Sequence, residues 1–183
     1  MRSLVLGVVC VSLVACEQVR LLRPRALKQL SPDTLRLVNE LPDLDEPNRE
    51  IVARLFAHGG LAHADEGDDH VQRSQIRVAP HEFIWQPAII VMEHAGELEL
   101  TFHNQDDTTH MALLPSDGER QILELPMHTA GRAKIKLDQP GLYWFGCPVA
   151  NHAGRGMLGL VIVKGYTPAE AKLDRPPQPL PGD

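Results

Sequence analysis

Cysteine is scarce in this chain and positive charge is not in excess. The 183 residues include three cysteines and carry a formal net charge of −6. Such a balance argues against nucleic acid binding, because nucleic acids are bound by clustered basic residues. The apolar run at residues 4–14 is also too short for a permanent membrane-spanning helix, which needs about 20 apolar residues. The length of the chain is enough for one domain with an extension, or for two small domains.

The first residues have the organisation of an export signal. Arg2 supplies a positive start, the apolar run follows, and Leu13-Val-Ala-Cys16 ends it. This ending resembles the lipobox of bacterial lipoproteins, in which the signal is cut before the cysteine and that cysteine is acylated. We therefore predict a signal peptide at residues 1–15, a lipidated Cys16, and a periplasmic or otherwise extracytoplasmic protein anchored to a membrane. An ordinary signal cut after Ala15 is the alternative.

Export leaves a single thiol to be explained. Cys10 would be removed with the signal and Cys16 would be blocked by lipid. Cys147 would then stand alone in an oxidising compartment, where an unpaired thiol is a liability. A metal site is a good reason for the chain to keep it.

Residues 16–60 carry the signals of short helices. Ser31-Pro32-Asp33 and Asp45-Glu46-Pro47 are typical helix starts, and Gly59-Gly60 is a typical helix end. The second of these helices places Ile51, Val52, Leu55 and Phe56 on one face. Short amphipathic helices bury little surface alone, so we expect them to pack on the following domain or on a partner.

A stretch rich in histidine and acidic residues follows the helices. His58, His63 and His70, together with four carboxylates, could capture a second metal ion. The ligands have no regular spacing, however, and the composition is also that of a flexible connection. We therefore interpret residues 61–74 as a linker rather than as a metal site.

From residue 75 onward the sequence changes to short β-type runs separated by Gly, Pro and Asp. Residues 75–164 therefore predict a small all-β sandwich, and the proline-rich residues 165–183 predict a disordered tail. The expected strands are Ile76–Ala79, Phe83–Trp85, Ala88–Met92, Leu98–His103, His110–Leu114, Gln121–Leu125, Ala133–Leu137, Leu142–Phe145 and Leu158–Val163.

Three potential metal ligands are crowded between residues 141 and 163. An apolar strand leads into Cys147, a turn carries His152, and a second turn delivers Met157 to the next strand. A thiolate, two imidazoles and a long axial thioether make the electron-transfer copper site. One imidazole is therefore missing, and His110 is the best candidate because it stands between a polar loop and a strand.

The other histidines of the sandwich fit less well. His103 alternates with apolar strand residues and is expected to face solvent. His94 belongs to a turn and His128 to a polar connection, so both are expected at the surface. His81 has no clear placement.

Three motifs resemble the cupredoxins, the family of small blue copper proteins. They are Asn104-x-Asp106-x-x-x-His110, Pro140-Gly-x-Tyr143-x-Phe145-x-Cys147, and Cys147-x4-His152-x4-Met157-x-Gly159, with a spacing most like the rusticyanin and auracyanin variants. The resemblance covers residues 75–164 and implies a Greek-key β-sandwich preceded by the helical extension. It also implies that His110, Cys147 and His152 are equatorial ligands and Met157 the axial ligand of one copper ion, which cycles between Cu(II) and Cu(I).

These ligands predict an electron carrier rather than an enzyme. Four protein ligands leave no open position for a small-molecule substrate, and the loop at 147–157 lacks the second cysteine of a binuclear centre. Small residues around His152 predict that its outer ring edge lies near solvent, where redox proteins would dock transiently. Copper storage or delivery, with the His58–His70 stretch as a second site, is the alternative function. A third is an interaction protein that docks through its helices.

Overall fold

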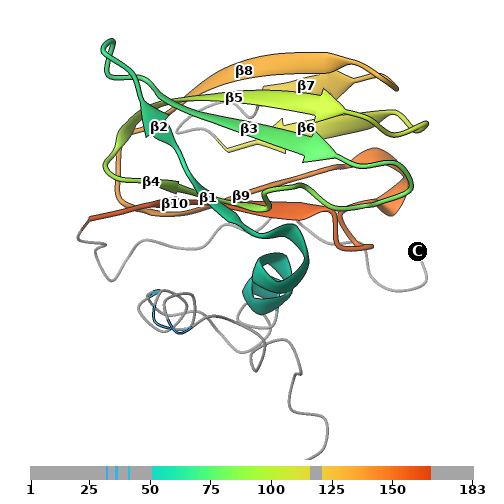
Figure 1. Cartoon of the computed structure of the whole chain (residues 1–183), viewed down its shortest axis with the longest axis horizontal. Coiled ribbons are helices and arrows are strands. Elements are labelled where there is room, and N and C mark those ends of the chain that lie inside the picture. The colour runs from blue at the N-terminus through green and yellow to red at the C-terminus, as the bar shows by residue number, and fades with distance from the viewer. Residues whose placement is uncertain (1–31, 33–35, 37–40, 42–50, 116–120, 166–183) are drawn as a thin grey trace, which may run out of the picture.

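The computed structural model describes residues 32, 36, 41, 51–115 and 121–165 (Figure 1). The predicted signal peptide, Cys16, most of the helical segment before residue 51 and nearly all of the proline-rich tail lie outside these residues. In the part that is described, no helix is long and apolar enough to cross a membrane.

The described residues contain ten strands, which run from Leu61 to Val163. They are β1 (Leu61–His63), β2 (Asp65–Glu66), β3 (Gln72–Val78), β4 (Ile89–Met92), β5 (Gly96–Asn104), β6 (His110–Leu114), β7 (Gln121–Leu125), β8 (Ala130–Leu137), β9 (Gly141–Gly146) and β10 (Leu158–Val163).

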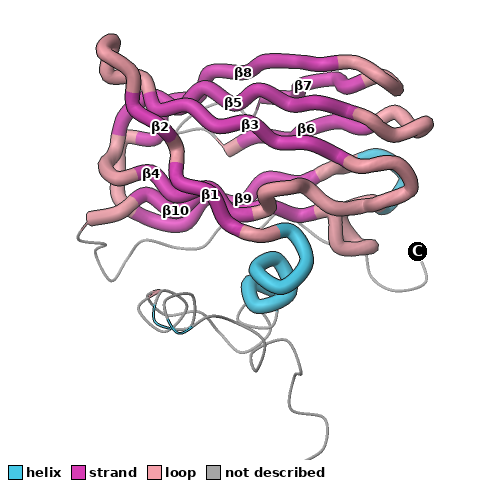
Figure 2. Tube along the Cα trace, viewed as in Figure 1, coloured by secondary structure: helices cyan, strands magenta, loops and turns pink. Residues whose placement is uncertain are grey.

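The strands, which are magenta in Figure 2, form a sandwich of two sheets. One sheet has six strands in the order β1-β4-β10-β9-β6-β7, and the other has four in the order β2-β3-β5-β8. Three pairings are parallel (β1 with β4, β4 with β10, β3 with β5) and the remaining pairings are antiparallel. This mixed, Greek-key-like order confirms the all-β sandwich predicted from the sequence.

The core lies between the sheets and takes its residues from the alternation of the strands. In β5, Leu98, Leu100 and Phe102 point inward and are at most 1% exposed, while the residues between them are partly exposed. In contrast, every residue of β4 and β10 is buried. These two strands lie in the middle of the larger sheet, so neighbouring strands, the opposite sheet and the preceding helix all contribute to their burial.

The helix before β1 is part of this core. Residues 51–59 are helical, their last turn widens into the π-helical turn η3 (Leu55–Gly59), and Gly60 ends it with φ of 74°. Val52, Leu55 and Phe56 are at most 7% exposed and belong to the same apolar cluster as the strands. The predictions that this helix ends at Gly59-Gly60 and packs on the following domain are confirmed.

The flexible linker predicted for residues 61–74 is wrong. Residues 61–63 pair with β4, residues 65–66 pair with β3, and β3 itself begins at Gln72, before the expected boundary at residue 75. The polar composition was misleading because only a few side chains of this stretch point inward. Ala64 and Val71 are buried, and the side chain of Gln72 bonds the backbone of Glu93 and His94.

The strand predicted at Phe83–Trp85 is also wrong. These residues lie in a loop that contacts β3 through one isolated bridge, between Arg77 and Gln86. The ring of Trp85 is fully buried, 5.4 Å from that of Phe102 and 6.0 Å from that of Phe145. Aromatic packing rather than strand pairing holds this loop. The other eight predicted strands are present, with β6, β7 and β10 at the expected bounds.

Gly59→Ala is expected to destabilise the fold. A Cβ atom on Gly59 would collide with the Cβ of Ala88 and lie 2.8 Å from the carbonyl oxygen of Trp85. Overpacking of this kind costs about 1–3 kcal/mol, which urea unfolding of the chain would measure. Ala57→Ser, on the exposed side of the same turn, is the control and should change stability by less than about 0.5 kcal/mol. Equal losses in the two variants would contradict the close packing of the helix on β4.

Candidate metal centre

The three residues predicted as equatorial ligands meet at one end of the sandwich. His110 begins β6, Cys147 directly follows β9, and His152 lies in the loop that joins β9 to β10. One ligand atom from each residue, two ring nitrogens and a sulfur, lie within 4.8 Å of one another. Among the residues that the structure describes, this is the only such group of three or more His, Cys, Asp or Glu side chains.

The register between β6 and β9 brings Cys147 to His110. Leu113 pairs with Gly146 in the antiparallel ladder, so Cys147 lies beside the first residues of β6. The amide of Met111 donates a hydrogen bond to Cys147 Sγ at 3.4 Å. Cys147 Sγ is 3.9 Å from Nδ1 of His110 and 3.4 Å from Nδ1 of His152. Both imidazoles therefore present the same ring nitrogen to the sulfur.

Backbone hydrogen bonds hold the loop that carries His152. The Cys147 amide donates to the Met157 carbonyl at 3.1 Å, and the Met157 amide donates to the His152 carbonyl at 2.9 Å. Ala150 and Asn151 take φ values of 41° and 60°, in the left-handed region that costs about 1–2 kcal/mol per non-glycine residue. The closed loop compensates for this strain and fixes the direction in which His152 points.

Asp106 orients His110 and sets its tautomer. Nε2 of His110 is 3.0 Å from Oδ2 of Asp106, and neither side chain is more than 2% exposed. Burial raises the pKa of Asp106, but hydrogen bonds from the amide of His81, from His110 and from the amide of Asp107 outweigh burial and hold that pKa below its usual range. An ionised carboxylate only accepts hydrogen bonds, so Nε2 of His110 carries the proton and Nδ1 keeps its lone pair towards Cys147.

Asn104 completes this unit. Its Oδ1 accepts the amide of Asp106 at 3.0 Å, and its Nδ2 donates to the carbonyls of Thr108 and Leu125 at 2.8 and 2.9 Å. The motif Asn104-x-Asp106-x-x-x-His110 is thus a folded unit that holds one imidazole. The sequence alone assigned no role to Asp106; its position four residues before His110 was the only signal.

The electrostatics of the other two residues suit a metal cation. Burial lowers the pKa of His152, and His110 and Arg155 lower it further, which favours the neutral imidazole that binds a metal cation. Burial raises the pKa of the Cys147 thiol. Hydrogen bonds from the amides of Met111 and Val149 lower that pKa but do not outweigh burial. A cation would displace the thiol proton, because the thiolate is the form that binds metal. One thiolate and two imidazoles fit copper in both of its common oxidation states.

The ring of Phe83 covers His152, and Arg155 lies over that ring in turn. The ring of Phe83 lies 4.6 Å from that of His152, and the guanidinium carbon of Arg155 lies 4.0 Å from the centre of the Phe83 ring. His152 is only 3% exposed, so the prediction that its outer edge lies near solvent is wrong. The small neighbours of His152 in sequence do leave space, but Phe83, from a distant loop, occupies it.

The two methionines near the group differ in burial. Met157 is fully buried at the end of the loop that carries His152. Met111 is half-buried and alternates with the buried His110 and Ala112, so its side chain points to the other face of β6.

The structure does not bring the three histidines of the predicted second metal site together. His63 bonds Glu93 at 2.9 Å, His70 bonds Glu66 at 3.1 Å, and His58 lies on the helical turn, where it lines a cavity. His94 and His128 are exposed, as predicted, and His103 is half-buried.

Solved structures similar to this fold include copper proteins of different kinds. Reduced auracyanin from Roseiflexus castenholzii is 15% identical over 51% of this chain and 97% of its own, with a TM-score of 0.46. The metal-binding domain of the Cu(I)-exporting P-type ATPase CopA from Streptococcus pneumoniae is 16% identical over 58% and 98%, with a TM-score of 0.47. A multicopper oxidase is 15% identical over 62% and 48%, with a TM-score of 0.46. Likenesses this distant assign no function.

Sequence comparison identifies the family directly. No curated protein matches this chain in sequence. A family model described as PQQ-associated matches residues 30–181, which include the helix at residues 51–59 and the sandwich. The chain therefore belongs to the PQQ-associated family, and its two mixed sheets form a β-sandwich of the kind that the motifs implied.

Proposed function

We propose that this protein transfers single electrons through one copper ion. His110, Cys147 and His152 would be its equatorial ligands and Met157 its axial ligand. The observation that carries this proposal is the convergence of two imidazole nitrogens and one sulfur within 4.8 Å in the protein interior. Copper held by these residues would supply one-electron chemistry by cycling between Cu(II) and Cu(I).

The chain's own residues contribute rigidity and exclusion of water. His110, Cys147 and Met157 are fully buried, and Asp106 and the closed loop hold the two imidazoles in place. A site whose ligands are already oriented needs little rearrangement when its charge changes. This lowers the barrier to electron transfer and supports a carrier.

The surroundings of the site also support a carrier over an oxidase. A cavity beside the group is lined by Phe83 and Arg155, but not by His110, Cys147 or His152. A redox partner would accordingly dock over Phe83 and Arg155 and exchange electrons through the ring of Phe83, which contacts His152. The family description supports a partner from a redox system that uses pyrroloquinoline quinone (PQQ).

We further propose that the protein is exported and held at a membrane surface by lipid on Cys16. The positive start, apolar run and Leu13-Val-Ala-Cys16 support this location. Mass spectrometry of the mature protein tests it, because an acylated cysteine would be the first residue.

Cys147→Ser is expected to abolish an intense visible absorption band of the copper-loaded protein at about 600 nm, since thiolate-to-Cu(II) charge transfer produces it in blue copper sites. Absorption spectra of oxidised and reduced protein measure the band. Met111→Leu is the matched control and should keep it, because that side chain points away from the site. Absence of the band from the copper-loaded wild-type protein would contradict the proposed copper site.

Asp106→Asn is expected to weaken Cu(II) binding by about 10–100-fold, the usual effect of losing a partner that orients a ligand. The reduction potential should also rise, because loss of a buried negative charge favours Cu(I). Competition with a chelator and spectroelectrochemical titration measure the two effects. Asp107→Asn is the control, since Asp107 is exposed and pairs with His128. Equal effects of the two substitutions would exclude an orienting role for Asp106.

The double variant His63→Ala/His70→Ala is expected to bind as much copper as the wild type, one ion per chain. The reason is that these histidines bond different carboxylates, Glu93 and Glu66, and lie apart from the group at Cys147. Metal analysis after removal of loosely bound copper measures the ratio. A fall from two ions to one would revive copper storage as the function.

A further inference from the structure

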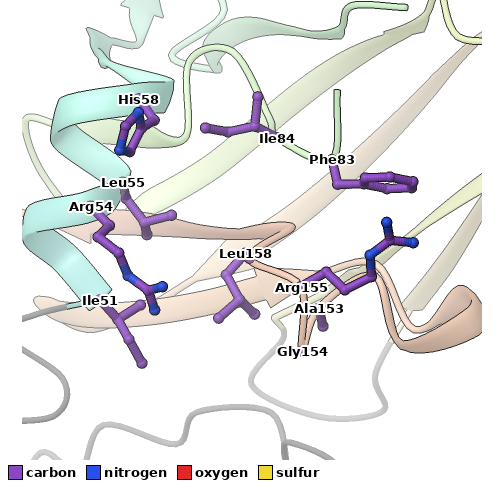
Figure 3. A pocket seen from close by; sticks show the side chains of 11 residues that line it. Ile51, Arg54, Leu55, His58, Phe83, Ile84, Ala153, Gly154, Arg155 and Leu158 are labelled. Carbon is purple, nitrogen blue, oxygen red and sulfur yellow. The ribbon is translucent and has the colours of Figure 1, made fainter. Parts of the chain in front are cut away.

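A cavity of about 310 Å³ lies between the helix and the loop that carries His152. Figure 3 shows it bounded by the helical residues on one side and by the turn at Ala153, Gly154 and Arg155 on the other. We refer to it as the basic-rimmed cavity. Neither element alone forms a hollow, so the sequence offered no sign of it.

The cavity has an apolar floor and a basic rim. Leu55 and Leu158 are buried beneath it, and Ile51, Ile84 and Phe83 are partly buried at its sides. Arg54, His58 and Arg155 are exposed around its opening. Pockets of about 300–1,000 Å³ with apolar walls and a few placed polar groups are typical of small-molecule sites.

The two guanidinium groups are available to an anion. Within the described part of the chain, no carboxylate forms an ion pair with Arg54 or Arg155, whereas Arg73 and Arg132 both have such partners. Arg155 instead lies over the face of Phe83. Two arginines that have no carboxylate partner among the described residues lie beside this apolar cavity, in a chain whose net charge is −6.

We propose that the basic-rimmed cavity binds a planar aromatic molecule that carries carboxylates. The apolar floor and the Phe83 ring would contact the flat ring system, and Arg54 and Arg155 would each pair with a carboxylate, which guanidinium groups bind in a bidentate manner. The concave shape and volume favour a small molecule over a segment of a partner protein. PQQ, a planar quinone with three carboxylates, belongs to this chemical class.

Binding at the cavity is independent of copper, but its position matters to the proposed function. A ligand in contact with Phe83 would lie next to the ring that covers His152. Failure of binding would therefore leave the copper site untouched, and failure of the copper site would leave binding intact.

The test is calorimetric titration of the full chain with PQQ, first metal-free and then copper-loaded. Wild type is expected to bind PQQ at least about tenfold more tightly than the uncharged PQQ trimethyl ester, because each charge-assisted contact contributes about that much. Arg54→Gln and Arg155→Gln should each weaken PQQ binding by about tenfold or more. Arg132→Gln, an exposed arginine on β8 in the other sheet, is the matched control and should leave binding unchanged.

Methyl NMR spectra locate the ligand without any substitution. Resonances of Leu55, Ile84 and Leu158 should shift on addition of PQQ, while those of Leu123, on the distant strand β7, should not. Absence of binding, equal binding of the ester, or equal losses in Arg54→Gln and Arg132→Gln would overturn the proposal. Shifts confined to other parts of the sandwich would also overturn it.

Discussion

The approach of Cys147 to His110 is the constraint on which the metal site depends. These residues are far apart in sequence, and the register that pairs Leu113 with Gly146 brings them together. Once β6 and β9 are paired, the Met111 amide reaches the Cys147 sulfur, and the following loop leads back into β10, which pairs antiparallel with β9. A shift of one residue in this register would turn Cys147 away from the site, because successive strand residues face opposite sides of a sheet.

Burial at this point creates a problem that the loop before β6 solves. An imidazole and a carboxylate removed from water are costly unless each finds partners. Asp106 accepts hydrogen bonds from His110 and from the amides of His81 and Asp107, and Asn104 holds the loop in turn. The same bonds that make burial tolerable also fix the tautomer of His110. The same hydrogen bonds therefore stabilise the buried Asp106 and orient His110 as a candidate ligand.

The helix and the loop with Phe83 and Trp85 extend the site beyond its ligands. Trp85 fills the core beneath His110, and Phe83 covers His152. The helix packs through Gly59 against Trp85 and Ala88, just before β4, and forms the far wall of the basic-rimmed cavity. The match to the family model covers residues 30–181, so the family pattern includes these additions as well as the sandwich. The surface that we propose for a partner or ligand is therefore formed by residues outside the four proposed copper ligands.

The sequence by itself determined the all-β class, eight of the strands, the end of the helix at Gly59-Gly60, and the four residues proposed as ligands. These features depend on local patterns: alternation along a strand, a glycine after a helix, and ligands spaced within one loop. The tertiary structure alone decided that residues 61–66 join the sheets, that Trp85 enters the core, and that Phe83 shields His152. It also decided that Asp106 holds His110 and that the helix and the loop enclose a cavity. Each of these is a contact between distant segments, whose energy comes from packing and pairing that no local pattern records.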